Sequence, residues 1–139
     1  MAMRVRVRLR SGSRDVVTSA VINTGFKTDT PNIAIPTPLA RMLGLWPLSG
    51  GELISLETGG GETEAYLVNN ALSLSLELED RVVGPIMVNA IINPNISEVL
   101  ISDYVTTQLG IVILNAKEGL WRLMDENKVR KSVEPTYWL

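Results

Sequence analysis

Few side chains in this 139-residue chain can do covalent or acid–base chemistry, and none of them is a cysteine or a histidine. The absence of cysteine excludes disulfides, thiolate nucleophiles and thiolate-bound zinc. The absence of histidine excludes Ser-His-Asp and Cys-His catalytic groups and histidine-bound metals, because no imidazole exists to act as base or ligand. Catalysis would therefore depend on carboxylates, hydroxyls, lysines or backbone groups, which favours a hydrolase that uses carboxylates alone.

Two short motifs place polar residues directly after apolar runs, where they could take part in such chemistry. The apolar run Ala20–Ile22 leads directly into Asn23-Thr24-Gly25, and a polar loop follows. Later, the apolar run Val99–Ile101 is followed by Ser102-Asp103 and by a segment that ends in Leu109-Gly110-Ile111-Val112. Together these motifs resemble the retropepsin-like aspartic proteases, especially their small single-domain prokaryotic members, over roughly Arg4 to Leu123.

The resemblance implies a mechanism and an assembly. In that family the turn reads Asp-Thr-Gly, and two such turns face each other, one from each subunit of a homodimer. Two carboxylates held about 3 Å apart share one proton, so that the ionised one activates water and the protonated one polarises the scissile carbonyl. The catalytic positions here are then Asn23, Thr24 and Gly25. The threonine hydroxyl would hold the two loops together, and the glycine would let the backbone approach the substrate. Such a site needs no metal and no cofactor, and its substrate would be a peptide or an unfolded protein.

Position 23 departs from the family pattern. Asparagine cannot act as a general base or share a proton as a carboxylate does. Since asparagine is nearly isosteric with protonated aspartate, the fold and the dimer could survive the change. Two interpretations stay open: an inactivated form of a working aspartic endopeptidase, or a naturally non-catalytic peptide-binding or dimerisation module on the same fold. The intact Thr24 and Gly25 favour the first.

Neither of the two aspartates near these motifs is expected to replace the missing carboxylate. Asp29 begins an Asp-Thr-Pro sequence, and proline lacks both the N–H and the backbone freedom of glycine. Asp103 is expected in the first turn of a helix, where an acid suits the helix dipole. Ser102 stands where the family commonly has glycine, and it is expected to cap that helix.

A glycine-rich stretch, Thr58-Gly59-Gly60-Gly61, separates two expected strands. The resemblance makes it a candidate flap, a hairpin tip that closes over an extended peptide and bonds to its backbone. A plain hairpin loop explains the same residues, and both interpretations stay open.

The sequence pattern indicates many short strands and two short helices as the elements that must position these residues. This combination predicts a mainly β barrel or sandwich. Thr37 is expected to cap a helix that starts at Pro38 and ends at Gly44. The second helix is expected from Ser102 to Leu109. The strands are expected at residues 3–10, 15–22, 33–35, 52–57, 62–68, 72–78, 82–92, 99–101, 111–114 and 120–123.

The two expected helices match each other in pattern. The segment Leu39–Leu45 and the segment Val105–Ile111 both end in Leu-Gly and an apolar residue, and each follows a short apolar strand. This echo predicts a duplicated strand–helix unit. The simpler alternative is that Leu-Gly is a common way for a helix to end.

Charge and hydropathy limit the classes of partner that the chain is expected to bind. The formal net charge of −2 gives no overall attraction to nucleic acid. A nucleic-acid-binding β-barrel has one supporting feature, the stripe of Arg4, Arg6, Arg8 and Arg10, which a solvated strand face also explains. No apolar run reaches the length of a membrane span, and the N-terminus lacks the apolar block of a signal peptide. The expected partners are therefore a second subunit and a peptide, without nucleic acid or membrane, and the expected compartment is the cytoplasm.

The resemblance divides the chain into a protease domain over residues 1–124 and a C-terminal tail over residues 125–139. The tail ends in Tyr137-Trp138-Leu139. Either it is disordered, as chain ends usually are, or its aromatic side chains anchor it as a strand in the dimer interface.

Overall fold

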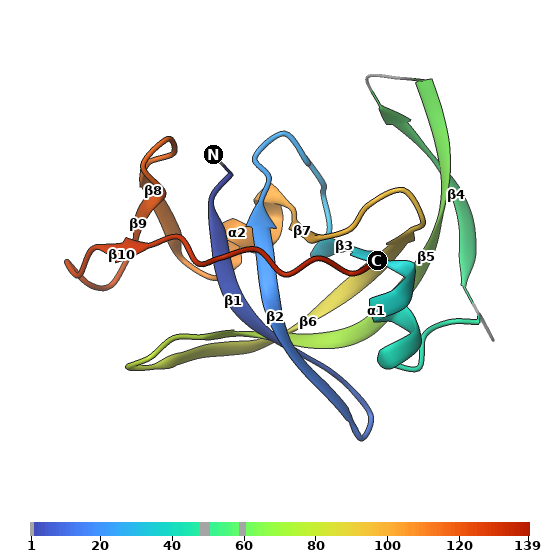
Figure 1. Cartoon of the computed structure of the whole chain (residues 1–139), viewed down its shortest axis with the longest axis horizontal. Coiled ribbons are helices and arrows are strands. Elements are labelled where there is room, and N and C mark those ends of the chain that lie inside the picture. The colour runs from blue at the N-terminus through green and yellow to red at the C-terminus, as the bar shows by residue number, and fades with distance from the viewer. Residues whose placement is uncertain (1, 48–50, 59–60) are drawn as a thin grey trace.

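Six strands close into a barrel in the order β1-β2-β7-β3-β6-β5, because β5 also pairs with β1 (Figure 1). The computed structural model describes residues 2–47, 51–58 and 61–139. The barrel strands are β1 (Arg4–Ser11), β2 (Arg14–Ile22), β3 (Asn32–Pro36), β5 (Gly61–Glu77), β6 (Val82–Asn93) and β7 (Val99–Ile101). The prediction of a mainly β protein with a barrel and two short helices is confirmed.

Two further parts extend from the barrel. β4 (Glu52–Thr58) pairs with the first half of β5 and lies at the end of the sheet order. A separate three-stranded sheet has the order β10-β9-β8, and Figure 1 shows it on the opposite side of the barrel from β4. Its strands are β8 (Ile111–Asn115), β9 (Leu120–Leu123) and β10 (Arg130–Lys131).

The alternation in β1 explains how the barrel fills its interior. Val5, Val7 and Leu9 are buried, whereas the arginines between them are half-buried or exposed. Since successive side chains of a strand point to opposite faces, one face of β1 packs inward and the other meets solvent. The main apolar core draws on all six barrel strands and on both helices, and Trp121 of β9 joins the small sheet to it.

The two strands expected at residues 62–68 and 72–78 form the single strand β5, so the predicted break is wrong. The polar pair Asn69-Asn70 produces a shift in register against β6 instead of a turn. Asn70 has a φ of 49°, and its backbone N–H donates to Oδ1 of Asn89 at 2.9 Å. The irregularity therefore bends β5, whose first half pairs with β4 and whose second half closes the barrel against β1.

The two helices differ in how they begin. The side chain of Ser102 accepts a hydrogen bond from the backbone N–H of Val105 at 3.3 Å, so the predicted cap of α2 (Asp103–Gln108) is confirmed. The predicted cap of α1 (Thr37–Met42) is wrong, because Thr37 is already the first helical residue and Pro36 stands at the N-cap without a side-chain hydrogen bond. The helix can begin at Thr37 because Pro36, the last residue of β3, already has the extended backbone of an N-cap residue.

The endings of the two helices are alike, as the internal echo predicts. Each helix has six residues, and each is followed by a leucine and by a glycine with a φ of +75°, Gly44 and Gly110. A residue with a side chain adopts this left-handed conformation at a cost, which explains the glycine. The strands before the helices, β3 and β7, are antiparallel neighbours in the barrel. These observations favour a duplicated strand–helix unit.

Candidate functional site

Asn23, Thr24 and Gly25 form a tight turn directly after β2. The backbone N–H of Asn23 donates to the carbonyl of Ile101 on β7 at 3.1 Å, and its carbonyl accepts from the N–H of Phe26 at 3.0 Å. The side-chain oxygen Oδ1 of Asn23 accepts from the N–H of Gly25 at 3.1 Å. The three residues predicted for the site thus lie in one turn, in which Asn23 is half-buried and the other two are exposed.

Gly25 has a steric reason to be glycine. A Cβ atom at this position would lie 3.3 Å from Oδ1 of Asn23, which is tighter than ordinary van der Waals contact. The side chain at position 23 therefore folds back over the backbone of position 25. An aspartate at position 23 has the same shape and would accept the same hydrogen bond with one of its two oxygens.

Asp103 holds the loop that follows the turn. It begins α2 as predicted, and its backbone N–H donates to the carbonyl of Phe26 at 2.9 Å. Its carboxylate oxygen Oδ1 accepts from the backbone N–H of Thr28 at 3.0 Å and from that of Tyr104 at 2.8 Å. Asp103 is thus a positioning residue for the loop, a role that its place in the sequence did not reveal. The other acid considered, Asp29, is exposed in the same loop.

A small apolar group, the side cluster, connects this turn with the β4–β5 hairpin. Its buried members are Ala34, Ala65 and Ile91. The half-buried side chains that pack on them are Phe26, Ile54, Leu56, Leu67, Ile96 and Leu100. Phe26 comes three residues after Asn23, and Ile54 and Leu56 belong to β4. The side cluster therefore offers partly exposed apolar surface between the turn and the hairpin.

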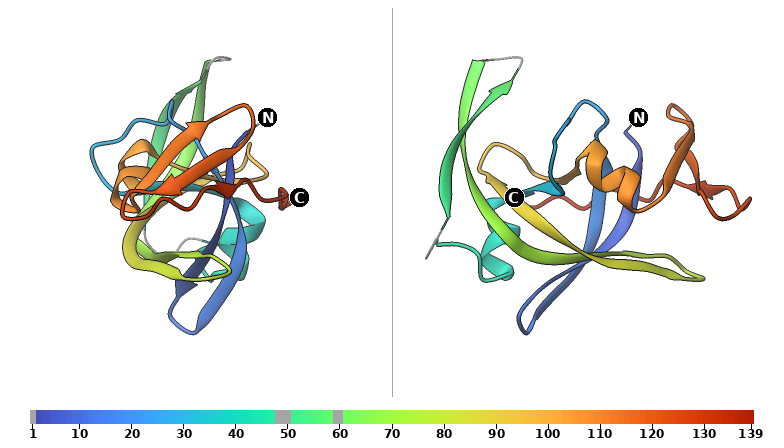
Figure 2. Two further views of the ribbon diagram at one scale, coloured as in Figure 1. Left: turned by 90° about the vertical axis from the view of Figure 1, so that its left-hand side faces the viewer. Right: turned by 180° about the vertical axis from the view of Figure 1, so that it is seen from behind.

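The hairpin expected around the glycine-rich stretch is present. β4 and β5 pair in antiparallel register from Glu52 opposite Leu67 to Thr58 opposite Gly61. Gly59 and Gly60 lie outside the described residues, so the candidate flap is described only by the backbone of Thr58 and Gly61. Figures 1 and 2 show β4 and β5 rising on the side of the barrel toward which the loop between β2 and β3 also projects.

The arginine stripe on β1 is largely used within the chain. Within the described part of the chain, three of its four arginines pair with carboxylates: Arg4 with Glu98 at 2.7 Å, Arg8 with Asp15 at 2.8 Å and with Glu77, and Arg10 with Asp15 at 3.3 Å. Paired arginines have less positive charge to offer to phosphates. This observation favours the interpretation of the stripe as a charged strand face.

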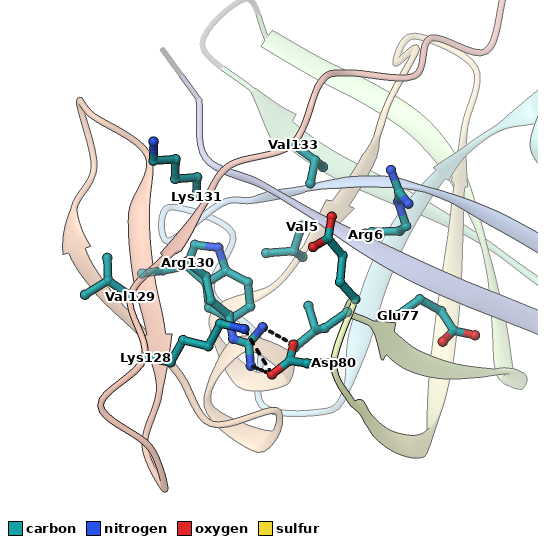
Figure 3. Close-up of a pocket in the computed structure, with 12 residues that line it drawn as sticks. Val5, Arg6, Glu77, Asp80, Lys128, Val129, Arg130, Lys131 and Val133 are labelled. Atoms are coloured by element: carbon teal, nitrogen blue, oxygen red, sulfur yellow. Dashed lines mark hydrogen bonds and ion pairs between the residues drawn. The ribbon is translucent and has the colours of Figure 1, made fainter.

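A second group of charges surrounds Arg130 and borders a cavity of about 370 Å³ (Figure 3). The Arg130 side chain is only 8% exposed and donates to both carboxylate oxygens of Asp80, at 2.6 and 2.9 Å, and to Glu126 at 2.7 Å. Lys128 lies 3.3 Å from Asp80, and the Arg130 guanidinium lies 5.9 Å from the ring of Trp121. The cluster fastens residues 126–130 to the turn between β5 and β6.

Hydrogen bonding sets the protonation of this cluster. The hydrogen bonds from Arg130 hold the pKa of the Asp80 carboxyl and the pKa of Glu126 below their usual ranges. Hydrogen bonding to Asp80, and then to Glu126, raises the pKa of Arg130. Both carboxylates stay charged in the folded state at pH values where they would take up protons in the unfolded chain.

Replacing Arg130 by methionine is expected to lower the melting temperature at pH 7 by roughly 5 °C or more, because Asp80 and Glu126 lose their main partner and keep only Lys128 and Arg81. Since the folded-state pKa values are lowered, this stabilisation is fully present above the ordinary carboxyl pKa of about 4 and is lost progressively as the pH falls from there through the lowered folded-state pKa values. Urea denaturation at pH 7 and at pH 3 measures the effect. The difference between parent and variant should be clearly smaller at pH 3.

Lys131→Met is the matched control, since Lys131 is the exposed neighbour of Arg130. It should leave the urea midpoint nearly unchanged at both pH values. A destabilisation by Arg130→Met of equal size at pH 7 and pH 3 would assign the effect to packing and not to charge.

Comparisons of the chain with protein-family models and with curated proteins found no match. In the described ranges, no helix is long and apolar enough to cross a membrane. Over the same residues, no three acidic side chains gather closely enough to hold a metal ion.

Proposed function

We propose that the chain is the aspartate-to-asparagine form of an aspartic endopeptidase that acts as a homodimer on extended peptides. The observation that carries the proposal is the tight turn at Asn23, in which the side-chain oxygen accepts from the N–H of Gly25. With aspartate at position 23, one carboxylate oxygen would keep this hydrogen bond. The second oxygen would be left to face its counterpart in the other subunit, where the asparagine has an amide nitrogen.

The mechanism that this geometry supports is acid–base hydrolysis by two carboxylates. Like charges held close together cannot both ionise, so the pair of aspartates would hold one proton. The ionised carboxylate would take a proton from water, and the protonated one would donate a hydrogen bond to the carbonyl under attack. The amide of Asn23 can donate a hydrogen bond but cannot take a proton from water, so under this proposal the chain with asparagine at position 23 would be inactive.

The surroundings of the turn suit an extended peptide. Three half-buried apolar side chains of the side cluster are available there. Phe26 lies beside the turn, and Ile54 and Leu56 lie on the hairpin. Extended peptides bind through main-chain hydrogen bonds to a strand or hairpin and through apolar contacts of alternate side chains. The hairpin and the side cluster would provide these two kinds of contact.

The sheet edge at β8 supports a dimer. Among the described strands β8 pairs only with β9, and Leu114 on β8 is 47% exposed. The C-terminal tail, for which disorder and a place in the dimer interface were both open, bonds to its own barrel, for example through the N–H of Val133 and the carbonyl of Arg4. An unpaired strand edge is a template for pairing with another chain. We therefore include β8 in the proposed interface.

Leu114→Lys is expected to weaken the dimer at least about tenfold, because a charged lysine on an edge strand opposes pairing. Sedimentation equilibrium over a range of concentrations measures the dissociation constant. Met124→Lys, which changes a still more exposed side chain outside β8, is the control and should leave the dimer intact. Equal weakening by both lysines would place the interface elsewhere, and a parent chain that is monomeric at all concentrations would contradict the dimer itself.

The alternative function is a non-catalytic peptide-binding or dimerisation module with a natural asparagine at position 23. The half-buried apolar surface of the side cluster would serve such a module equally well. Restoring the carboxylate separates the two: the Asn23→Asp chain should hydrolyse unfolded protein if the proposal is correct, whereas a binding module should remain inert.

A further inference from the structure

The loop between β6 and β7, residues 94–98, contacts three separate parts of the molecule. The Asn95 side chain donates from Nδ2 to Oγ1 of Thr63 on β5 at 2.6 Å. Glu98 accepts from Nε of Arg4 on β1 at 2.7 Å. The carbonyl of Ser97 accepts from the backbone N–H of Trp138 at 2.7 Å. The loop thus lies between the hairpin, the barrel and the C-terminal segment.

The C-terminal segment, residues 132–139, is here called the strap. Figure 1 shows it crossing in front of β1 and β2. The N–H of Thr136 donates to Oγ of Ser19 at 2.7 Å, and Nε1 of Trp138 donates to Oγ1 of Thr18 at 3.1 Å. The half-buried Trp138 ring also packs against the main core. Trp138 therefore fastens the strap to the barrel and, through its N–H, to the loop.

The hairpin needs support from outside its own two strands. Over the residues that the structure describes, β4 pairs only with β5, and β5 begins to pair with β6 only at Tyr66. Residues 54–58 and 61–65 of the hairpin therefore form a two-stranded ribbon, which is marginally stable in water by itself. The loop supplies support at two points, the Asn95–Thr63 hydrogen bond and the packing of Ile96 in the side cluster.

We propose that Trp138 and Asn95 are positioning residues for the β4–β5 hairpin: the strap holds the loop at residues 94–98, and the loop holds the hairpin. The strap thereby regulates how often Ile54 and Leu56 of the hairpin leave the side cluster. The relevance of this coupling to peptide cleavage rests on the proposed function. The coupling itself is a property of the folded chain and does not depend on which residue stands at position 23.

Hydrogen exchange, measured with asparagine kept at position 23, tests the coupling without any activity. Trp138→Ala is expected to accelerate exchange of hairpin amides, residues 52–56 and 62–65, about five- to tenfold, since local opening of the hairpin becomes easier. Amides of β2 and β6 within the barrel should change less than about twofold. Tyr137→Ala, at the exposed neighbouring position, should leave the hairpin amides unchanged. Trp138→Phe keeps an aromatic ring to pack against the main core, loses the side-chain bond to Thr18, and should restore most of the protection that Trp138→Ala removes.

A double-mutant cycle separates a relay from general loosening. Asn95→Ala should itself accelerate the hairpin amides, and adding Trp138→Ala to it should have a clearly smaller effect than in the parent chain. Three results would each overturn the proposal: unchanged hairpin amides in Trp138→Ala, equal acceleration in hairpin and barrel, or effects of the two substitutions that multiply as independent sites would. None of these outcomes depends on whether the Asn23→Asp chain cleaves peptides.

Discussion

The Asn23→Asp chain is expected to cleave unfolded protein at least about 10³-fold faster than the parent, because the substitution restores the only base that the proposed site lacks. The parent has no histidine or cysteine to take over this role. The turn requires no rearrangement, since an aspartate can accept the hydrogen bond that Asn23 accepts from Gly25 at 3.1 Å. The change therefore adds one carboxylate per subunit and little else.

The measurement is cleavage of an unfolded protein across acidic to neutral pH, with a pepstatin-type inhibitor as a further arm. A pair of carboxylates that shares one proton loses activity both when the pair is fully protonated and when it is fully ionised, so the rate should pass through a maximum. Asn127→Asp, which adds the same charge at an exposed position, is the control and should stay inactive. A folded, dimeric Asn23→Asp chain that cleaves nothing would favour the binding module.

The second large effect is expected in the barrel wall. Leu74→Ala should lower the free energy of unfolding by about 2–5 kcal/mol, because the buried side chain leaves a cavity. Leu74 is 0% exposed and lies on β5 between Leu9 of β1 and Ile86 of β6. Hydrogen bonds to β1 and β6 on both sides hold the backbone of β5, so the barrel wall cannot close freely into the cavity that the missing side chain leaves.

Urea denaturation followed by circular dichroism measures this loss. Leu53→Ala is the matched control, since Leu53 is 56% exposed on β4 and its truncation should cost less than about 1 kcal/mol. Similar losses from the two leucines would mean that closure of the barrel between β1 and β5 contributes little to stability.

The sequence predicted those parts of the fold that depend on local pattern. β7 and β9 have the predicted bounds, and the inward face of β1 is the one that its alternation indicated. These predictions succeed because side-chain alternation and burial follow from the same geometry of a strand. The turn at Asn23 was likewise placed by its motif, directly after a buried strand.

The break predicted in β5 failed because a long-range partner overrode a local signal. Asn69-Asn70 is typical of a turn, yet the side chain of Asn89 accepts the N–H of Asn70 and keeps the strand beside β6. Local polarity does not reveal that such a partner exists.

Contacts between residues far apart in the chain could not be predicted from the sequence either. The carboxylate of Asp103 bonds to the backbone of Thr28, 75 positions away, and Arg130 bonds to Asp80, 50 positions away. The strap likewise carries no strand pattern of its own. Its position depends on a few separate hydrogen bonds to β1, β2 and the loop at residues 94–98. Such contacts exist only after the chain has folded around them.

The closure of the barrel between β1 and β5 has a kinetic consequence. Val7 pairs with Thr18 in the adjacent hairpin, but it also pairs with Leu76 of β5, far along the chain. Pairing over so many residues gives the fold a high contact order, and such proteins fold in milliseconds to seconds. The β1–β2 hairpin is expected to form early and to wait with one edge of β1 unpaired. During synthesis from the N-terminus, that edge is open to other chains until β5 has emerged.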